Sequence, residues 1–353
     1  MRVCVIGAGP AGSTCAALVA ERHDVTLIDK TRDFDDRVCG GAVSGLQLRR
    51  WGIELPNIKT RRMKGVVLHA PSGRTSTLGG GFAECYIFDR CEFDAALARR
   101  AEKAGAELVL GERVRKVYRE GSGFRVVGER GEYRADIVVD ASGPRARFAK
   151  MLGLAPPMGV DDYRFTVQAL FDAADDDDFL HIYFGEEFAP KTYAWVFPSV
   201  EGVKVGVGVI MDGRANPNRC LERFIERVGI EGKILWRRGK DVPVTTVGGL
   251  VRRNAMAVGD AARTASPTSG GGIVPAIVSG RAAARAILEG KPQRYKRYMW
   301  RLRLENWIRL KFRRSFPMDD QWFERLVSRA NDLNIESATI PTVIRNLMKM
   351  RWL

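Results

Sequence analysis

The chain has few histidines and lacks the cysteine spacings that are typical of metal sites. It has three histidines in 353 residues, and no two of its cysteines form a C-x-x-C pair. The cysteines are six scattered residues: Cys4, Cys15, Cys39, Cys85, Cys91 and Cys220. We therefore expect no metal site, and we expect the reduced thiols of a cytosolic protein.

Long apolar runs are also missing. No stretch reaches the roughly 18 apolar residues that a membrane-spanning helix needs. Met1 is followed at once by RVCVIGAGPAG, a pattern that predicts a strand and a turn rather than a signal peptide. We therefore expect a cytoplasmic protein whose membrane contacts, if any, are made at the surface.

Acidic residues are few relative to basic ones. The chain has 57 Lys and Arg against 42 Asp and Glu, which gives a formal net charge of +15. This excess indicates an anionic partner, which can be nucleic acid, an anionic membrane surface or a phosphate-bearing ligand. No nucleic-acid recognition motif is present, so we expect no nucleic-acid partner. The length suits two domains, or one α/β domain with an inserted subdomain.

The N-terminal segment RVCVIGAGPAGSTCAALVAERHDVTLIDK predicts a dinucleotide-binding unit. Gly7, Gly9 and Gly12 fit G-x-G-x-x-G between a buried strand and an alanine-rich helix at residues 11–21. These glycines permit a tight turn, close approach of a pyrophosphate and close helix packing, and the helix N-terminus attracts phosphate. Asp29 ends the second strand, where its carboxylate can accept a hydrogen bond from a ribose 2′-OH.

A second glycine-rich segment lies at residues 254–290. A predicted strand ends at Gly259 and Asp260, and the run Gly270–Gly272 opens another helix at Ile273. A carboxylate at a strand end can bind a polyol, and a helix N-terminus can face an electron-rich ring. Both features suit FAD, which is longer than NAD, although a helix-capping role for Asp260 is the alternative.

Aromatic residues alternate in the segment KTYAWVFPSVEGVKVGVGV. If this segment is a strand, Tyr193, Trp195 and Phe197 share one face and form a row about 13 Å long. Such a row suits the wall of a pocket for a long apolar ligand, and it equally suits an ordinary core face.

Several motifs together resemble a known family. VIGAGPAG, YIFDRCEFDAALARRA, ADIVVDASG and AVGDAARTASPTSGGGI occur in the order found in FAD enzymes of the p-hydroxybenzoate hydroxylase-like fold. RVCGGAVS and TYAWVFP make the chain similar to the geranylgeranyl reductase family, in particular its archaeal type, which reduces digeranylgeranylglycerophospholipids. The chain departs from many members at Arg263, where they have glycine.

The resemblance implies an α/β (α+β) fold with a discontinuous Rossmann-like FAD-binding domain. That domain is expected at residues 1–58, 89–155 and 244–290. An inserted antiparallel-sheet substrate domain is expected at residues 59–88 and 156–243, and a basic helical region at residues 291–353. The six strand segments expected in the inserts are KGVVLHAP, RTSTL, YRFTVQALFD, FLHIYFG, TYAWVFP and VKVGVGVI.

The resemblance also assigns roles to residues. Tyr193, Trp195, Phe197 and Pro198 are expected to bind a polyprenyl lipid, and Cys39, Tyr193 and Trp195 are the catalytic candidates. The residues expected to bind FAD are Gly7, Gly9, Pro10, Ala11, Gly12, Asp29, Lys30, Cys39, Gly40, Gly41, Arg90, Val114, Asp140, Ala141, Gly259, Asp260, Gly270, Gly271, Gly272 and Ile273. Arg90 is expected to support the phosphates, with a plain surface arginine as the alternative.

The implied reaction is saturation of an isoprenoid double bond by hydride from reduced flavin and a proton from a second group. Cys39, Tyr193 or a water is the proton donor, and Cys39 has a packing role as its alternative. A flavin-dependent monooxygenase or halogenase on the same fold is the alternative function. No second G-x-G-x-x-G follows residue 150, so the electrons are expected from transient NADPH, a ferredoxin or another reductant.

The segment KPQRYKRYMWRLRLENWIRLKFRR predicts a basic helix with two possible roles. It has ten Lys and Arg but one acid, Glu305, interleaved with Trp and Leu. This mixture suits peripheral contact with the anionic inner face of a membrane. The alternative is a helix packed on the FAD domain with a basic face in solvent.

Overall fold

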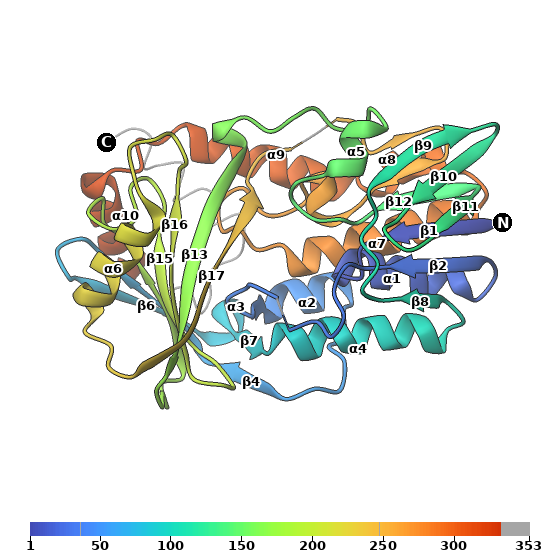
Figure 1. Cartoon of the computed structure of the whole chain (residues 1–353). Coiled ribbons are helices and arrows are strands. Elements are labelled where there is room, and N and C mark those ends of the chain that lie inside the picture. The colour runs from blue at the N-terminus through green and yellow to red at the C-terminus, as the bar shows by residue number, and fades with distance from the viewer. Residues whose placement is uncertain (36, 247, 333–353) are drawn as a thin grey trace.

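The computed structural model describes residues 1–35, 37–246 and 248–332. Two large sheets lie at opposite ends of the molecule, and helices occupy the region between and around them (Figure 1). The last part of the expected basic helical region, residues 333–353, lies outside the described residues.

The sheet at the N-terminal end has six strands in the order β18-β19-β12-β1-β2-β8. Its neighbours pair in parallel, except that β18 and β19 form an antiparallel pair. The central strands are apolar along their length because both faces of the sheet are covered, one by helices and the other by a small antiparallel sheet described below. The strands are β1 (Arg2–Ile6), β2 (Asp24–Ile28), β8 (Glu107–Val109), β12 (Ile137–Asp140), β18 (Val251–Arg252) and β19 (Ala255–Ala257).

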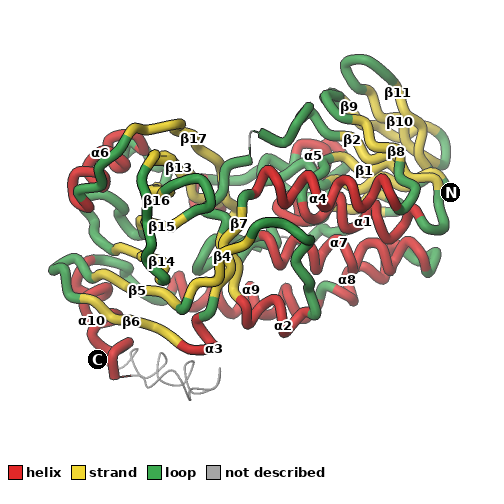
Figure 2. The backbone as a smooth tube through the Cα atoms, turned by 90° about the horizontal axis from the view of Figure 1, so that it is seen from below, coloured by secondary structure: helices red, strands yellow, loops and turns green. Residues whose placement is uncertain are grey.

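Three long helices pack beside this sheet. They are α1 (Pro10–Ala20), α4 (Arg90–Lys103) and α7 (Ile273–Leu288), and α1 contacts both of the others (Figure 2). The small residues of α1 and α7 allow close approach, since a Cβ on Gly280 would lie 2.4 Å from the Ala11 carbonyl oxygen. The helix predicted at residues 11–21 is therefore present and begins one residue earlier.

Smaller elements lie around and between the two large sheets. One three-stranded antiparallel sheet comprises β9 (Lys116–Glu120), β10 (Gly123–Val127) and β11 (Glu132–Ala135). A second joins β3 (Ala42–Ser44), β7 (Cys85–Phe88) and β4 (Thr60–Met63). The short helical segments are α2 (Gly45–Trp51), α3 (Gly80–Ala83), α5 (Arg147–Met151), η1 (Val160–Asp162), η2 (Gly259–Ala262) and η3 (Pro292–Arg294).

The second large sheet has seven strands in the order β17-β13-β16-β15-β14-β5-β6. Six of them match the six predicted strand segments. The prediction of an antiparallel sheet needs one correction, because β14 and β5 pair in parallel. The strands are β5 (Gly65–His69), β6 (Thr75–Gly79), β13 (Tyr163–Asp172), β14 (Phe179–Tyr183), β15 (Ala194–Pro198), β16 (Val203–Val209) and β17 (Lys233–Pro243). Strand β17 was not predicted because KILWRRGKDVP lacks an apolar alternation and contains glycine.

The two faces of this sheet have different partners. On one face the alternate residues Val167, Ala169, Val205 and Val207 pack against helix α6 (Pro217–Val228). The opposite face of the sheet carries the aromatic row of β15, and side chains of this face turn toward the segment that follows β2. One face therefore supplies the local core and the other is free to build a site.

The described C-terminal part is helical, as predicted. It comprises α8 (Tyr295–Tyr298), α9 (Trp300–Arg314) and α10 (Asp320–Asp332). Tyr295 and Met299 are fully buried, and the Tyr295 hydroxyl donates to the Ala257 carbonyl at 2.9 Å. Among the described helices, none combines the length and apolar character needed to cross a bilayer.

Candidate functional site

The glycine loop after β1 depends on two tight contacts and leaves one open side. Gly7 has φ +112°, and a Cβ there would lie 2.3 Å from the Ala141 carbonyl oxygen. A Cβ on Gly12 would lie 1.9 Å from the Gly7 carbonyl oxygen. A Cβ on Gly9, in contrast, would meet no atom of the described residues within 4 Å. The open side of Gly9 adjoins the N-terminus of α1, whose free N–H groups favour phosphate, and Pro10 occupies the first helical position.

Asp29 holds this loop to the end of β2. Its buried carboxylate accepts from the Ala8 amide at 2.6 Å and from the Thr31 amide at 2.9 Å. Arg37 lies 3.3 Å from the same carboxylate. The side chain that we predicted to meet a ribose therefore also fixes the phosphate loop, while the adjacent Lys30 is exposed.

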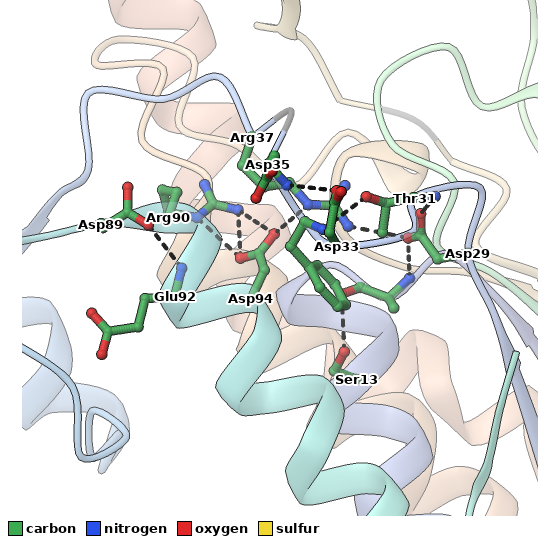
Figure 3. A network of polar contacts seen from close by, with 12 residues as sticks. Ser13, Asp29, Thr31, Asp33, Asp35, Arg37, Asp89, Arg90, Glu92 and Asp94 are labelled. Carbon is green, nitrogen blue, oxygen red and sulfur yellow. Dashed lines mark hydrogen bonds and ion pairs between the residues drawn. The ribbon is translucent and has the colours of Figure 1, made fainter. Parts of the chain in front are cut away.

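A chain of buried charges continues from Asp29 into helix α4 (Figure 3). Arg37 Nε lies 3.2 Å from Asp94 Oδ2, and Arg90 donates to both Asp94 oxygens at 2.9 and 3.0 Å. Asp94 is 1% exposed and Arg90 is 8% exposed. The alternative of a surface arginine at position 90 is therefore wrong, because Arg90 is a buried member of this network.

The network ends beside Cys39, the first residue of the predicted Cys-Gly-Gly turn. The Gly41 amide donates to the Cys39 sulfur at 3.4 Å, and Gln168 Nε2 donates to the Cys39 carbonyl at 3.1 Å. Burial opposes ionisation of this thiol, but Arg90, the Gly41 amide and Lys240 outweigh burial and lower its pKa. Cys39 is therefore more acidic than an ordinary thiol.

The turn fits closely between its neighbours. Gly41 has φ +81°, and a Cβ there would lie 2.5 Å from the Phe88 carbonyl oxygen, so the position requires glycine. A Cβ on Gly40 would lie 3.0 Å from the ring of Phe197. The buried Lys204 reaches the same turn, with its Nζ 3.7 Å from the Cβ position of Gly41.

The three aromatic rings follow one another along one face, as predicted. The ring centroids of Tyr193 and Trp195 are 6.0 Å apart, and those of Trp195 and Phe197 are 6.3 Å apart. The Trp195 ring lies over Gly206, where a Cβ would be 2.2 Å from the indole, and Pro198 ends strand β15. The buried Trp195 Nε1 has no hydrogen-bond partner among the described residues.

The row is tied to the second glycine-rich segment. The Tyr193 hydroxyl donates to the Ser269 carbonyl at 2.6 Å, and burial together with nearby Cys39 raises the pKa of Tyr193 to about 12. Asp260 faces Lys240, with Oδ2 3.6 Å from Nζ. Asp260 lies in the first turn of η2, and neither η2 nor α7 has a side-chain hydrogen bond at its N-cap in the described part of the chain.

The glycines of the second segment differ in their surroundings. Gly259 has φ +60°, and its Cβ position is 2.9 Å from the side chain of Ala11, which makes it a packing point against α1. Gly270 also has positive φ, and the Cβ position of Gly271 is 3.3 Å from a serine hydroxyl. Ile273 begins helix α7, whose first turn therefore faces this loop.

Three predicted cofactor positions make structural contacts within the protein. The fully buried Asp140 carboxylate accepts from the amides of Ser142 at 2.9 Å and Ala149 at 2.5 Å, and burial raises its pKa. Ala141 supplies the carbonyl that contacts the glycine loop, and the Val114 side chain packs in the main core. The side chains of Asp140 and Val114 are therefore engaged in the fold itself.

Arg263 occupies the left-handed region of the backbone with φ +51°. Its side chain is buried, and its guanidinium lies 3.3 Å from Asp162 and donates to the Pro156 carbonyl at 2.9 Å. The arginine that departs from the family pattern therefore connects the second glycine-rich segment to the start of the sheet insert.

Several residues of this site are not among those expected from the sequence. They are Arg37, Asp94, Gln168, Lys204 and Lys240. Two of them could have been found from the sequence. Asp94 follows Arg90 by four residues on a helix, a spacing that favours an ion pair. Lys204 is a charged residue in an otherwise apolar strand, on the same sheet face as the aromatic row. The others depend on contacts between segments far apart in the chain.

Two family models match the chain. The model "FAD dependent oxidoreductase" matches residues 2–196, and the model "Geranylgeranyl reductase catalytic domain" matches residues 162–247. The second match contains the aromatic row and the strand that carries Lys240.

Named relatives and solved structures agree with these matches. The digeranylgeranylglycerophospholipid reductase of Methanosarcina acetivorans is 34% identical over 81% of this chain and 75% of its own. That of Methanothrix thermoacetophila is 33% identical over 81% of this chain and 77% of its own. A geranylgeranyl bacteriochlorophyll reductase-like structure from Thermoplasma acidophilum has a TM-score of 0.87 at 27% identity, covering 99% of this chain and 96% of that one. A flavin-dependent brominase shares the fold alone, with a TM-score of 0.70 at 18% identity and 99% coverage of both chains.

The open side of Gly9 generates a prediction. The variant Gly9→Val should fold but purify without flavin, because its side chain would occupy only the space that a pyrophosphate needs. The measurement is the visible absorbance of the purified protein together with its thermal unfolding midpoint.

A matched control is Gly81→Val, since a Cβ on Gly81 likewise meets nothing within 4 Å in the part of the chain that the structure describes. This control should remain yellow. A yellow Gly9→Val protein would contradict the assignment of the loop.

Proposed function

Because the chain belongs to the geranylgeranyl reductase family of FAD-dependent oxidoreductases, we propose that it saturates carbon–carbon double bonds of geranylgeranyl chains in membrane lipids or their precursors. The observation that carries this proposal is the contact between the Cys39–Gly41 turn and the ring of Phe197. This contact brings an acidic thiol and an apolar row together at the end of the phosphate loop network.

The residues present fit FAD in two respects. The glycine loop has an open side at Gly9 next to a helix N-terminus, and the carboxylates of Asp29 and Asp260 lie near the two glycine-rich segments. We propose that these groups hold the phosphates and hydroxyls, with the α7 N-terminus facing the ring system. When bound and reduced, FAD supplies the hydride for one alkene carbon.

We propose that Cys39 supplies the proton for the other alkene carbon. The cations Arg90 and Lys240 lower its pKa, and Gln168 fixes its backbone. Tyr193 is the weaker donor, because its hydroxyl is committed to the Ser269 carbonyl and its pKa is raised. The alkene gains one hydride and one proton, and the resulting Cys39 thiolate recovers its proton from solvent between turnovers.

The aromatic row is proposed to bind the chain of the substrate. Trp195 and Phe197 present apolar surface along one line, and this surface excludes water from an alkene that no carbonyl activates. Pro198 ends the row and limits its length. The electrons are proposed to come from NADPH, a ferredoxin or another reductant, and the protein is proposed to act at the anionic inner face of the membrane.

The function is tested by an anaerobic assay. Protein reduced with dithionite and incubated with a geranylgeranyl lipid should give products heavier by two hydrogen atoms per saturated bond, as read by mass spectrometry. Unchanged lipid across a series of prenyl substrates would defeat the proposal. Substrate-stimulated oxygen consumption would instead support the alternative, a monooxygenase or halogenase on the same fold.

The proton-donor role predicts a pH profile. Turnover should fall as the pH rises through the lowered pKa of Cys39, which lies below the ordinary thiol value of 9.0, because the thiolate has no proton to give. Lys240→Gln should move this alkaline limb to higher pH, since it removes one of the charges that favour the thiolate.

Lys233→Gln, an exposed change on the same strand, is the matched control and should leave the profile unmoved. Alkylation near neutral pH should select Cys39, because the pKa values of the other five cysteines are all raised. If the alkaline limb of Lys240→Gln lies at the same pH as that of wild type, Cys39 is ruled out as the proton donor.

The proposed role of the aromatic row predicts that changing it lowers prenyl turnover without removing FAD. Trp195→Ala should lower prenyl turnover while FAD remains bound, and Trp195→Phe should retain part of the turnover because a ring is kept. Removing a buried tryptophan costs about 3–5 kcal/mol of unfolding free energy, so flavin content and the unfolding midpoint must be measured beside the rate. Trp322→Ala, outside the row, is the control, and equal turnover in Trp195→Ala and wild type would contradict the role.

A further inference from the structure

Helix α9 presents apolar side chains to solvent. Its buried face is formed by Leu302, Asn306 and Leu310. The opposite face carries four large apolar residues that are exposed by 47–62%: Trp300, Leu304, Trp307 and Ile308. A surface helix normally has polar residues on this side.

This face is a continuous patch. The four residues are spaced by four, three and one positions, so they lie within about one third of the helix circumference. The other exposed large apolar residues in the described part of the chain are mostly single and scattered, as on any soluble protein. A contiguous apolar patch marks an interaction surface.

The patch has a basic border. Lys311 Nζ lies 5.7 Å from the Trp307 ring centroid, and Arg297, Arg301 and Arg314 are exposed along the same helical region. The one acid of this region, Glu305, is paired with Arg50 and lies 3.5 Å from Arg301. The border is therefore strongly positive.

A cleft adjoins the N-terminal end of the patch. Its volume is about 470 Å³, and it is lined by Arg285, Glu289, Arg294, Arg297, Tyr298 and Trp300. The Arg285 and Arg294 side chains each lie 3.0 Å from Glu289, and Tyr298 also donates to that carboxylate. Hydrogen bonds from Tyr298 and the two arginines lower the pKa of Glu289 to about 2. Three guanidinium groups against one ionised carboxylate leave the cleft positive.

The inner face of α9 is joined to the candidate site. Asn306 Nδ2 donates to the Thr264 carbonyl at 2.8 Å, and Arg313 donates to the Pro267 carbonyl at 3.0 Å. This segment continues to Ser269, which accepts from the Tyr193 hydroxyl. Figures 1 and 2 both place α9 between the seven-stranded sheet and the α7–α8 helices.

We propose that the outer face of α9 docks the protein on an anionic bilayer, with Trp300, Leu304, Trp307 and Ile308 at the acyl boundary and the arginine cleft on a lipid phosphate. The proposal rests on the proposed function, because a geranylgeranyl lipid resides in that bilayer. The basic border matches anionic headgroups in charge, and mixed tryptophan and basic residues are typical of interfacial helices. Docking on this face would leave the segment beside Tyr193 next to the source of substrate.

The test is co-sedimentation of the full-length FAD-bound protein with vesicles of neutral lipid alone or with one third phosphatidylglycerol. Wild type should bind the anionic vesicles, and Trp300→Ser with Trp307→Ser should weaken binding by about tenfold or more. Arg297→Gln should weaken binding to the anionic vesicles about fivefold. It should also make that binding less dependent on salt concentration. Ile234→Ser with Leu235→Ser, which removes exposed apolar residues from β17, is the matched control and should bind as wild type.

A second readout separates this proposal from the proposed function. The double tryptophan variant should lose turnover of vesicle-embedded lipid but keep turnover of a detergent-dispersed prenyl substrate. If wild type reduces neither substrate yet binds vesicles through α9, the proposed function fails and the docking face stands.

Two results would overturn the docking face. One is equal vesicle binding by wild type and the double tryptophan variant. The other is a wild-type dimer by light scattering that becomes a monomer in that variant, with no vesicle binding, since a second copy of the chain would then cover the patch.

Discussion

The close approach of the Cys39–Gly41 turn to the aromatic row is the constraint on which the rest of the structure depends. Gly41 must be glycine because a Cβ there would clash with the Phe88 carbonyl oxygen. At Gly40, a Cβ would press against the ring of Phe197. Gln168 reaches from the sheet to the Cys39 carbonyl and fixes the distance between the two parts. An apolar wall and an acidic thiol are thereby held at one point, although they come from segments more than 150 residues apart.

Buried charge connects that point to the phosphate loop. The sequence of contacts runs from the Ala8 amide through Asp29, Arg37 and Asp94 to Arg90, beside Cys39. Removing one member of such a network leaves a buried partner without compensation, which costs about 3–5 kcal/mol. Asp94, which lies between Arg37 and Arg90, therefore connects the loop to the thiol. The same Arg90 charge that satisfies Asp94 also favours the Cys39 thiolate.

Much of this arrangement could be predicted from the sequence because its signals are local. The glycine loop, the first helix and the alternating strand that carries Trp195 each need only neighbouring residues, and all are present. Strand β17 was missed because its residues do not alternate, so Lys240 was missed with it. Arg37 and Gln168 gave no local signal, since their partners lie on other elements. The sequence left two roles open for the basic region, packing on the FAD domain or contact with a membrane surface. The structure shows features of both, because α9 buries Leu302 and Leu310 and exposes Trp300 and Trp307.

The most direct test of the account is an experimental structure of the reduced protein with a bound geranylgeranyl lipid analogue under anaerobic conditions. We predict that the prenyl chain runs along Trp195 and Phe197 and ends with one double bond between the flavin and the Cys39 sulfur. A chain bound on another face of the seven-stranded sheet, or rings packed with no ligand beside them while the lipid lies elsewhere, would contradict it.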